Sequence, residues 1–233
     1  MSDVKDKVVL IFGGAGGIGS ATAQDLASKG AKIAVADINE AKAKYVARTI
    51  RNTGGDSRVY PVDVTMKEQV QATVATVAHD FGSLDAMINC AGIMFVRPLI
   101  EINTVELNIK GSLWAIAAVL PVFLRQQRGH IINLSSVHGL KVFSPGGAVH
   151  SASKYALRAL SEGLRAELAS TPIRSTLITP GAVDTGIQHK TTGSDSARML
   201  EIYKNAIPPD AVARAITFAM EQPANVDINE IVV

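Results

Sequence analysis

Two kinds of apolar pattern alternate along the chain. Short runs of consecutive apolar residues indicate buried strands, and stretches whose apolar residues recur every three or four positions indicate helices. The runs predict strands at residues 8–12, 32–36, 57–62, 86–88, 130–134 and 174–179, with an edge strand at 228–233. The periodic stretches predict helices at residues 20–29, 39–53, about 65–81, a long stretch ending before 129, 150–169 and 208–220. Residues 185–205 are polar and give no clear assignment.

Alternating strands and helices predict an α/β fold, a single-domain, doubly wound parallel sheet flanked by helices on both faces. The carboxyl ends of parallel strands meet at one edge, where ligands bind in folds of this kind. In this chain those ends carry Gly13, Asp37, Asp63, Asn89, Ser135 and Pro180. Polar and glycine-rich residues are therefore expected to line a site along this edge.

The glycine-rich stretch Gly13–Gly19 lies between the first strand and the first helix. Glycine permits conformations and close approaches that side chains forbid, and a helix N-terminus adds unpaired N–H donors and partial positive charge. This combination favours a bound diphosphate. The spacing G-x-x-x-G-x-G differs from the common dinucleotide fingerprint, and taken alone it also fits a flexible turn.

Asp37 ends the second strand, eighteen residues after Gly19. An acidic residue at about this distance is placed to accept hydrogen bonds from the ribose of an adenine dinucleotide. Its negative charge would also repel a 2′-phosphate on that ribose. The sequence therefore predicts NAD as the cofactor in preference to NADP.

Composition narrows the partners and the setting. The 233-residue chain is 47% hydrophobic and has a net charge of +2 with no basic cluster, which argues against nucleic acid or a membrane surface as partner. Its single cysteine, Cys90, excludes an intrachain disulfide framework, and no metal site is indicated. No apolar run approaches the roughly 20 residues that span a bilayer, and the polar N-terminus shows no secretory signal. A cytoplasmic protein is therefore expected.

His150 and Lys154 stand four residues apart at the start of a predicted helix and share one of its faces. Leu157 and Ser161 continue this face, beside an apolar stripe. Lys154 is therefore expected at the margin of the core, either as a cation facing the ligand edge or as a lysine whose amine reaches solvent. His150 is either a surface residue that caps the helix or part of the same site.

Further motifs follow the glycine stretch: Asp63-Val64, Asn89-Cys90-Ala91-Gly92, Asn108-Ile109-Lys110-Gly111, Asn133-Leu134-Ser135-Ser136, Ser153-Lys154 and Pro180-Gly181-Ala182-Val183-Asp184-Thr185. In this order the motifs resemble those of the classical short-chain dehydrogenase/reductase family, over nearly the whole chain. The resemblance implies that residues 1–233 form one NAD(P)-binding Rossmann-type domain. It also implies a nicotinamide cofactor, interconversion of an alcohol and a ketone or aldehyde, and a homotetramer or homodimer.

The same resemblance implies roles for individual residues. Those expected to bind the cofactor are Gly13, Gly17, Ile18 and Gly19 at the pyrophosphate, Asp63 and Val64 at the adenine, Asn89, Ala91 and Gly92 along the channel, and Pro180, Gly181, Val183 and Thr185 at the nicotinamide. Ser136 would polarise the substrate oxygen, and Lys154 would bind the nicotinamide ribose. Asn108 would hold a water that passes protons to Lys154.

Several features depart from the family pattern. The position of the family's catalytic tyrosine, four residues before Lys154, holds His150. Tyr155 cannot replace that tyrosine, because it lies on the wrong side of the lysine. Phe12 stands where the family usually has threonine, and the segment 98–108 looks shorter than usual.

The exchange of tyrosine for histidine changes the expected chemistry. Imidazole is shorter than phenol, so one water is expected to bridge His150 and the substrate oxygen. The nearby Lys154 should lower the pKa of His150, and a neutral imidazole would act as a base and favour alcohol oxidation. The alternatives are an NAD-binding protein with little or no catalysis, and a purely structural or interaction protein.

Substrate contacts are less sharply indicated. Ile93, Met94, Val142 and Phe143 follow strand ends and are expected to form an apolar pocket wall or ordinary core. His138 is expected at the surface or against the substrate. Residues 185–207 are expected to form a lid over a small or medium apolar alcohol or carbonyl compound.

Overall fold

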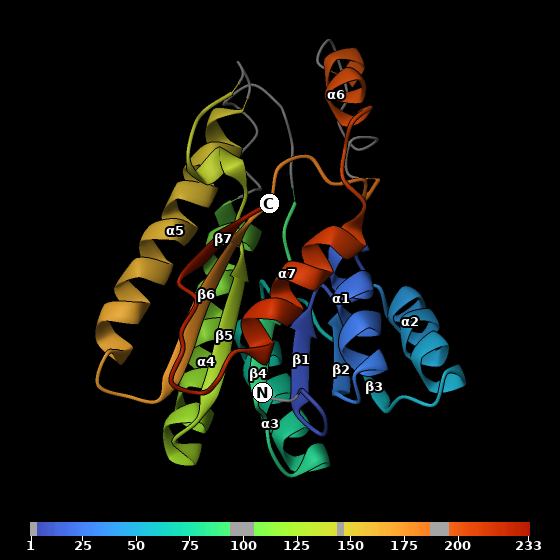
Figure 1. Ribbon diagram of the computed structural model, residues 1–233, viewed down its shortest axis with the longest axis vertical. Helices are drawn as coiled ribbons and strands as arrows, with labels where there is room; N and C mark the ends of the chain where they lie inside the picture. Colours follow the sequence, from blue (N-terminus) through green and yellow to red (C-terminus); the bar gives the residue numbers. More distant parts are fainter. Residues whose placement is uncertain (1–3, 94–104, 144–146, 187–195) are drawn as a thin grey trace.

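The computed structural model describes residues 4–93, 105–143, 147–186 and 196–233, and its strands form one sheet between two layers of helices (Figure 1). The strands are β1 Val8–Phe12, β2 Lys32–Asp37, β3 Ser57–Pro61, β4 Ala86–Asn89, β5 Gly129–Leu134, β6 Ile173–Thr179 and β7 Glu230–Val232. Their order is β3-β2-β1-β4-β5-β6-β7, and every neighbouring pair is parallel. The order reverses between β1 and β4, which confirms the predicted doubly wound α/β fold.

Helices cover both faces of this sheet. They are α1 Gly17–Ser28, α2 Glu40–Asn52, α3 Lys67–Phe81, α4 Gly111–Gln126, α5 Ala148–Leu168, α6 Ser196–Tyr203 and α7 Pro209–Glu221. A π-helical turn, η1 Glu106–Lys110, leads into α4, and a 3₁₀ turn, η2 Val137–Gly139, follows β5. α1, α2 and α7 pack on one face of the sheet, and α3, α4 and α5 pack on the other. α6 stands above the sheet edge in Figure 1.

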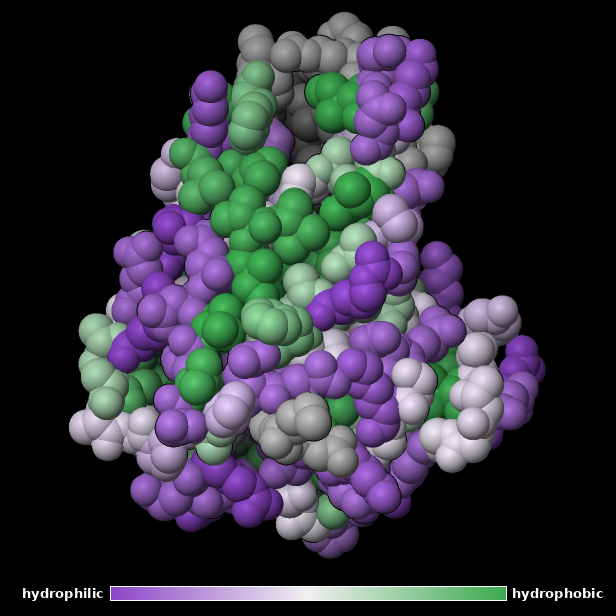
Figure 2. Space-filling model, in the orientation of Figure 1, coloured by the Kyte–Doolittle hydropathy of each residue, from purple (hydrophilic) through white to green (hydrophobic). Residues whose placement is uncertain are grey.

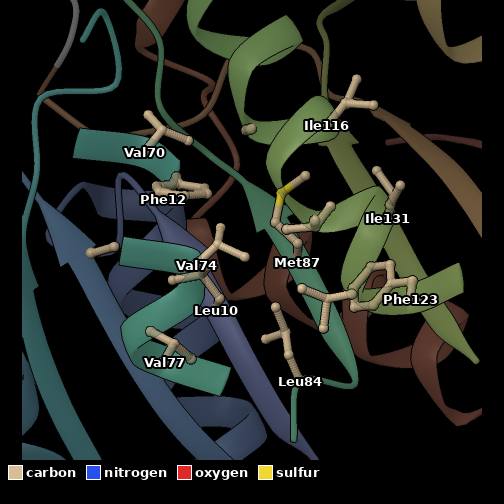
Figure 3. Close-up of a cluster of buried hydrophobic side chains, with 14 of the residues drawn as sticks. Leu10, Phe12, Val70, Val74, Val77, Leu84, Met87, Ile116, Phe123 and Ile131 are labelled. Carbon is tan, nitrogen blue, oxygen red and sulfur yellow. The ribbon is translucent and has the colours of Figure 1, made fainter. Parts of the chain in front are cut away.

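Side-chain alternation along β1 explains the two layers. Leu10 and Phe12 belong to the cluster built with α3 and α4, and Figure 3 shows them beside Val74. Val9 and Ile11 belong to the cluster built with α1, α2 and α7. Because both faces of β1 are buried, the strand appears in the sequence as a continuous apolar run.

Two helix starts differ from the sequence prediction, and each difference has a local cause. α1 begins at Gly17 instead of residue 20, because the end of the glycine stretch already forms its first turn. α3 begins at Lys67 instead of about residue 65. The Thr65 hydroxyl donates to the Asp63 carboxylate at 2.7 Å, and α3 begins after Met66 without a side-chain cap. The unassigned polar stretch contains α6.

The helix Glu106–Gln126, formed by η1 and α4 together, is 21 residues long and apolar enough to cross a membrane by length and composition. This corrects the expectation that no apolar stretch approaches that length. Ala115, Val119 and Phe123 of this helix are buried in the cluster that lies on the sheet. Its buried face therefore explains part of its apolar composition.

His130 on β5 makes stability depend on pH. It is buried, with Nε2 at 2.8 Å from the Thr176 hydroxyl, and burial and the charge of Arg174 lower its pKa well below the ordinary value. The unfolded chain binds a proton near pH 6.5 that the folded protein does not bind. We therefore expect the urea midpoint to fall steadily as the pH is lowered below about 6.5.

The double variant His130→Leu/Thr176→Val removes the imidazole and the hydroxyl together, so that neither polar group is left buried without its partner. We expect it to flatten part of the pH dependence measured by urea unfolding. Some dependence should remain, because the pKa of His150 is also lowered and this histidine titrates in the same direction. An unchanged pH dependence in the double variant would show that His130 is not responsible.

Candidate functional site

Close backbone packing holds the glycine turn in one conformation. Gly13 has a φ of +71°, and a Cβ there would lie 2.6 Å from the backbone nitrogen of Ala91. A Cβ at Gly19 would overlap the carbonyl oxygen of Gly13, and one at Gly17 would lie 2.8 Å from the Cβ of Thr185. The turn therefore requires glycine at these positions, because a side chain would push neighbouring backbone or Thr185 away.

The N-terminus of α1 offers backbone N–H groups to a ligand. Gly16 is the N-cap, no described side chain caps it, and the first turn carries no acidic residue. The amides of Gly17, Ile18 and Gly19 thus have no capping side chain as partner. These three residues line a cavity of about 200 Å³. The arrangement fits the pyrophosphate of a dinucleotide, which amide donors and the positive helix end would bind.

A second cavity, of about 340 Å³, adjoins the first and extends toward β2 and β3. Asp37 lines it, and its carboxylate accepts hydrogen bonds from the N–H groups of Ala15 (2.9 Å) and Asn39 (2.8 Å). Asp63 and Val64 line the same cavity. The structure therefore gathers the residues expected at the adenosine half of the cofactor around one space.

The residues expected at the nicotinamide end line the first cavity. They are Pro180, Gly181, Val183 and Thr185, and Ser136, His150 and Lys154 line the same space. Gly92 lines both cavities, and Ala91 lines the second. The sequence prediction thus placed these residues on one continuous site.

Asn89 and Asn108 lie behind the cavities and are not among their described lining residues. Asn89 is buried, and its amide donates to the Ser112 hydroxyl at 2.9 Å, so its side chain is engaged with α4 and its place on the channel stays a prediction. Asn108 holds Ile93, accepting from its N–H and donating to its carbonyl, both at 3.0 Å. It also donates to the Ser153 hydroxyl at 3.1 Å. Asn108 therefore fixes the backbone beside the cavity, and its water-holding role stays a prediction.

Ser136 follows β5, and its Oγ accepts a hydrogen bond from the N–H of His138 at 3.2 Å. Its own hydroxyl hydrogen is left for a ligand in the cavity. Ser135 also lines the cavity, but its hydroxyl donates to the backbone carbonyl of Lys154 at 3.4 Å. The second serine of the pair is therefore the better donor to a substrate oxygen.

His150 is only 4% exposed, so the alternative of a surface cap is wrong. Burial lowers its pKa to about 3, with smaller contributions from Lys154 and His138 and an opposing effect of a hydrogen bond to the Ile93 backbone. The sequence prediction named the lysine as the cause, whereas desolvation is the larger effect. The imidazole is neutral near pH 7, and its Nδ1 has no partner within the described ranges.

Lys154 is 7% exposed, so the alternative in which its amine reaches solvent is also wrong. Its Nζ donates to the backbone carbonyl of Leu134 at 2.9 Å. Burial lowers the pKa of this amine to about 8, so it is mostly protonated at pH 7 and loses the proton in mild alkali. The site thus pairs a neutral imidazole with a buried cation on one helix face.

The expected apolar wall is only partly confirmed. Ile93 lines both cavities, whereas Val142 and Phe143 are half exposed and do not line them. Met94 lies outside the described residues, as do residues 98–104 of the segment that looked short and residues 187–195 of the expected lid.

The position of Tyr155 explains why it does not replace the family tyrosine. Its hydroxyl donates to the backbone carbonyl of Leu140 at 2.5 Å, and the side chain is exposed. Tyr203, in contrast, lines the first cavity, although nothing in the sequence pattern marked it. Cys90 lines both cavities, and burial raises the pKa of its thiol to about 12, so it is not a thiolate at neutral pH.

Comparison with known sequences places the chain in a family. The model of the short chain dehydrogenase family matches residues 7–195. An uncharacterized oxidoreductase of Staphylococcus saprophyticus is 41% identical over 244 residues, covering 100% of this chain and 97% of that protein. One of Listeria monocytogenes is 40% identical over 240 residues, covering 99% and 96%. This chain therefore belongs to the short-chain dehydrogenase family, oxidoreductases that use a nicotinamide cofactor.

Solved structures agree with this placement. A metagenomic short-chain oxidoreductase in complex with NADP has a TM-score of 0.84 and 27% identity, covering 100% of this chain and 98% of that one. The closed form of a serine dehydrogenase complexed with NADP⁺ has a TM-score of 0.87 and 25% identity, covering 97% and 94%. The resemblance inferred from the sequence motifs and the Rossmann-type fold are thus confirmed.

Proposed function

We propose that this protein is an NAD-dependent oxidoreductase that interconverts an alcohol and a ketone or aldehyde. The observation that carries the proposal is a single cavity lined by the glycine turn together with Ser136, His150 and Lys154. A bound nicotinamide would accept or supply the hydride. The chain's own residues then have to bind and orient both reactants and move one proton.

Three side chains divide this work in the proposed mechanism. Ser136 donates its hydroxyl hydrogen to the substrate oxygen, because its Oγ already accepts from a backbone N–H. Lys154, as an ammonium, binds the ribose hydroxyls at the nicotinamide end. His150 accepts the alcohol proton, directly or through one water, and releases it to solvent. A pKa of about 3 makes this imidazole a weak base, so slow turnover is expected.

Initial rates test the proposal. Cyclohexanol and 1-phenylethanol are offered with NAD⁺, and cyclohexanone and acetophenone with NADH, at about pH 8, where a neutral imidazole accepts protons and does not donate them. We expect measurable oxidation that is faster than reduction at matched cofactor concentration. Faster reduction would contradict the role of His150 as proton acceptor.

Asp37 is proposed to select NAD. Replacing it in Asp37→Ser should lower the ratio of NADPH to NADH dissociation constants roughly 10- to 100-fold, because hydrogen bonds to a charged group contribute about 1.5–3 kcal/mol and the repulsion of a 2′-phosphate is lost. Cofactor fluorescence measures both constants. Glu40→Gln, which removes an exposed charge at the start of α2, is the matched control and should leave the ratio unchanged. Two structural neighbours bind NADP, so tighter binding of NADPH by the unchanged protein would overturn the proposal.

A second candidate function is binding of the nicotinamide cofactor with little or no catalysis. The observation in its favour is the buried His150, which at neutral pH is neither a proton donor nor a strong base. This candidate predicts saturable NADH binding without turnover of any alcohol in the panel.

We also propose that the protein is a cytoplasmic homotetramer or homodimer that works without nucleic acid or a membrane, with residues 1–233 as one domain. Leu113 and Leu124 are exposed on the outer side of α4 and support contact between copies. We further propose that residues 185–207, which include α6, act as a lid over the substrate.

A further inference from the structure

Two groups of exposed apolar side chains lie on segments that adjoin residues lining the first cavity. Leu140, Val142 and Phe143 follow η2, and Leu200 and Ile202 lie on α6. Each of the five is between 42% and 52% exposed, and we call them the apolar rim. Single exposed apolar residues are normal, but a group beside a reaction site marks a surface that binds something apolar.

Ring contacts connect one side of the rim to the reacting residues. The rings of Phe143 and His138 pack edge to face with centroids 5.2 Å apart, and the rings of His138 and His150 do the same at 5.2 Å. Phe143 is therefore two ring contacts away from an imidazole that lines the cavity. The hydrogen bond from Tyr155 to the Leu140 carbonyl fixes the chain on this side.

The other side of the rim is joined to the cavity through Tyr203. This residue lines the cavity and follows Ile202 directly, and Leu200 lies close to one helical turn before it. Shortly after α6, the N–H of Ile207 donates to the carbonyl of Ala182 at 2.9 Å, within the segment at the nicotinamide end. α6 is thus anchored beside the cavity while it exposes apolar side chains.

Two lysines whose side chains are described next to the rim have partners. Lys141 lies over the ring of Phe143, with Nζ 6.0 Å from the centroid, and Lys204 forms an ion pair with Glu201 at 2.5 Å. A further band of hydrophobic residues in Figure 2 lies lower on this face, over the region where Figure 1 places β7 and the C-terminus. The apolar side chains themselves favour an uncharged hydrocarbon group over an ionic ligand, because an ion would lose hydration against them.

We propose that the apolar rim binds the hydrocarbon body of the substrate. The substrate class is then an uncharged alcohol or ketone with an aliphatic or alicyclic group long enough to extend from Ser136 and His150 to the rim. This inference rests on the proposed function, which puts the reacting carbon at those two residues. The sequence alone suggested a small or medium substrate, whereas the rim favours a longer one. Each additional methylene that is buried against the rim is expected to raise affinity roughly fourfold.

Ketone binding tests the inference without requiring turnover. 2-Butanone, 2-hexanone and 2-decanone are titrated by calorimetry into the protein loaded with NADH, and into the protein alone. We expect affinity to rise with chain length, by up to roughly fourfold per methylene.

Phe143→Ser and Ile202→Ser should each weaken 2-decanone binding about tenfold and leave 2-butanone binding unchanged. Phe218→Ser on α7, which replaces a side chain that is 53% exposed, is the matched control and should change neither.

The outcomes separate this inference from the proposed function. Equal affinity for the short and long ketones, or an equal loss in the control variant, would overturn the rim proposal. A change in the sedimentation of the rim variants without a change in ketone affinity would also overturn it, because a second copy of the chain would then occupy the rim. Chain-length-dependent binding without turnover of the matching alcohols would support the rim and contradict only the proposed activity.

Discussion

Replacing His150 by tyrosine is expected to raise the rate of alcohol oxidation by roughly 10²–10⁴-fold, the usual contribution of a well-placed acid or base. The phenol reaches further into the cavity than the imidazole does. The ammonium of Lys154, four residues along the same helix face, would lower the pKa of the phenol and favour its proton-accepting form. Initial rates with cyclohexanol and NAD⁺ measure the gain.

The matched control for this exchange is His79→Tyr, at an exposed position of α3, which should leave the rates unchanged. NADH affinity should stay the same in both variants, because neither residue belongs to the expected cofactor contacts. A His150→Tyr variant that binds NADH but turns over no faster than the parent would show that the histidine is not what limits the reaction. The segment 98–108 would then be the next place to search for the cause.

Replacing Gly19 by alanine is expected to weaken NADH binding on the order of 100-fold. The added Cβ would overlap the carbonyl oxygen of Gly13, so the turn and the amides at the start of α1 must shift. Losing one or two hydrogen bonds to a charged phosphate, at about 1.5–3 kcal/mol each, is enough for a loss of this size. The dissociation constant from NADH fluorescence measures the loss.

Gly163→Ala provides the matched control, because a Cβ at this position of α5 meets open space. We expect it to leave NADH affinity unchanged and to raise the free energy of unfolding by about 1 kcal/mol, since alanine favours helix over glycine. Normal NADH affinity in a folded Gly19→Ala variant would mean that the glycine turn does not hold the cofactor.

Local sequence signals were sufficient for the strands and for several residues that line the two cavities at the edge of the sheet. β1 could be predicted because an unbroken apolar run followed by glycines has few other interpretations. Asp37 could be placed because parallel strands end at the same edge of the sheet. These features depend on neighbours in the sequence and on the direction of the strands.

Features that depend on contacts between distant segments could not be predicted. The prediction that His150 and Lys154 share one helix face was correct. Their near-complete burial, however, comes from packing against other elements, and this burial is the main cause of both lowered pKa values. The amide of Asn89 donates to the hydroxyl of Ser112 on α4, a contact between elements far apart in the sequence that no local pattern predicts. Tyr203 reaches the cavity only because α6 is anchored there, and the stretch 185–205 as a whole gave no periodic signal.

Titration of the folded protein with NADH tests most directly whether the glycine turn and Asp37 form a site for an adenine dinucleotide. We predict a saturable change in NADH fluorescence, matched by heat in calorimetry, with NAD⁺ competing for the same site. The absence of saturable association with both the reduced and the oxidised nucleotide, in a protein shown to be folded by its circular dichroism, would contradict the proposed oxidoreductase function whatever group donates the proton.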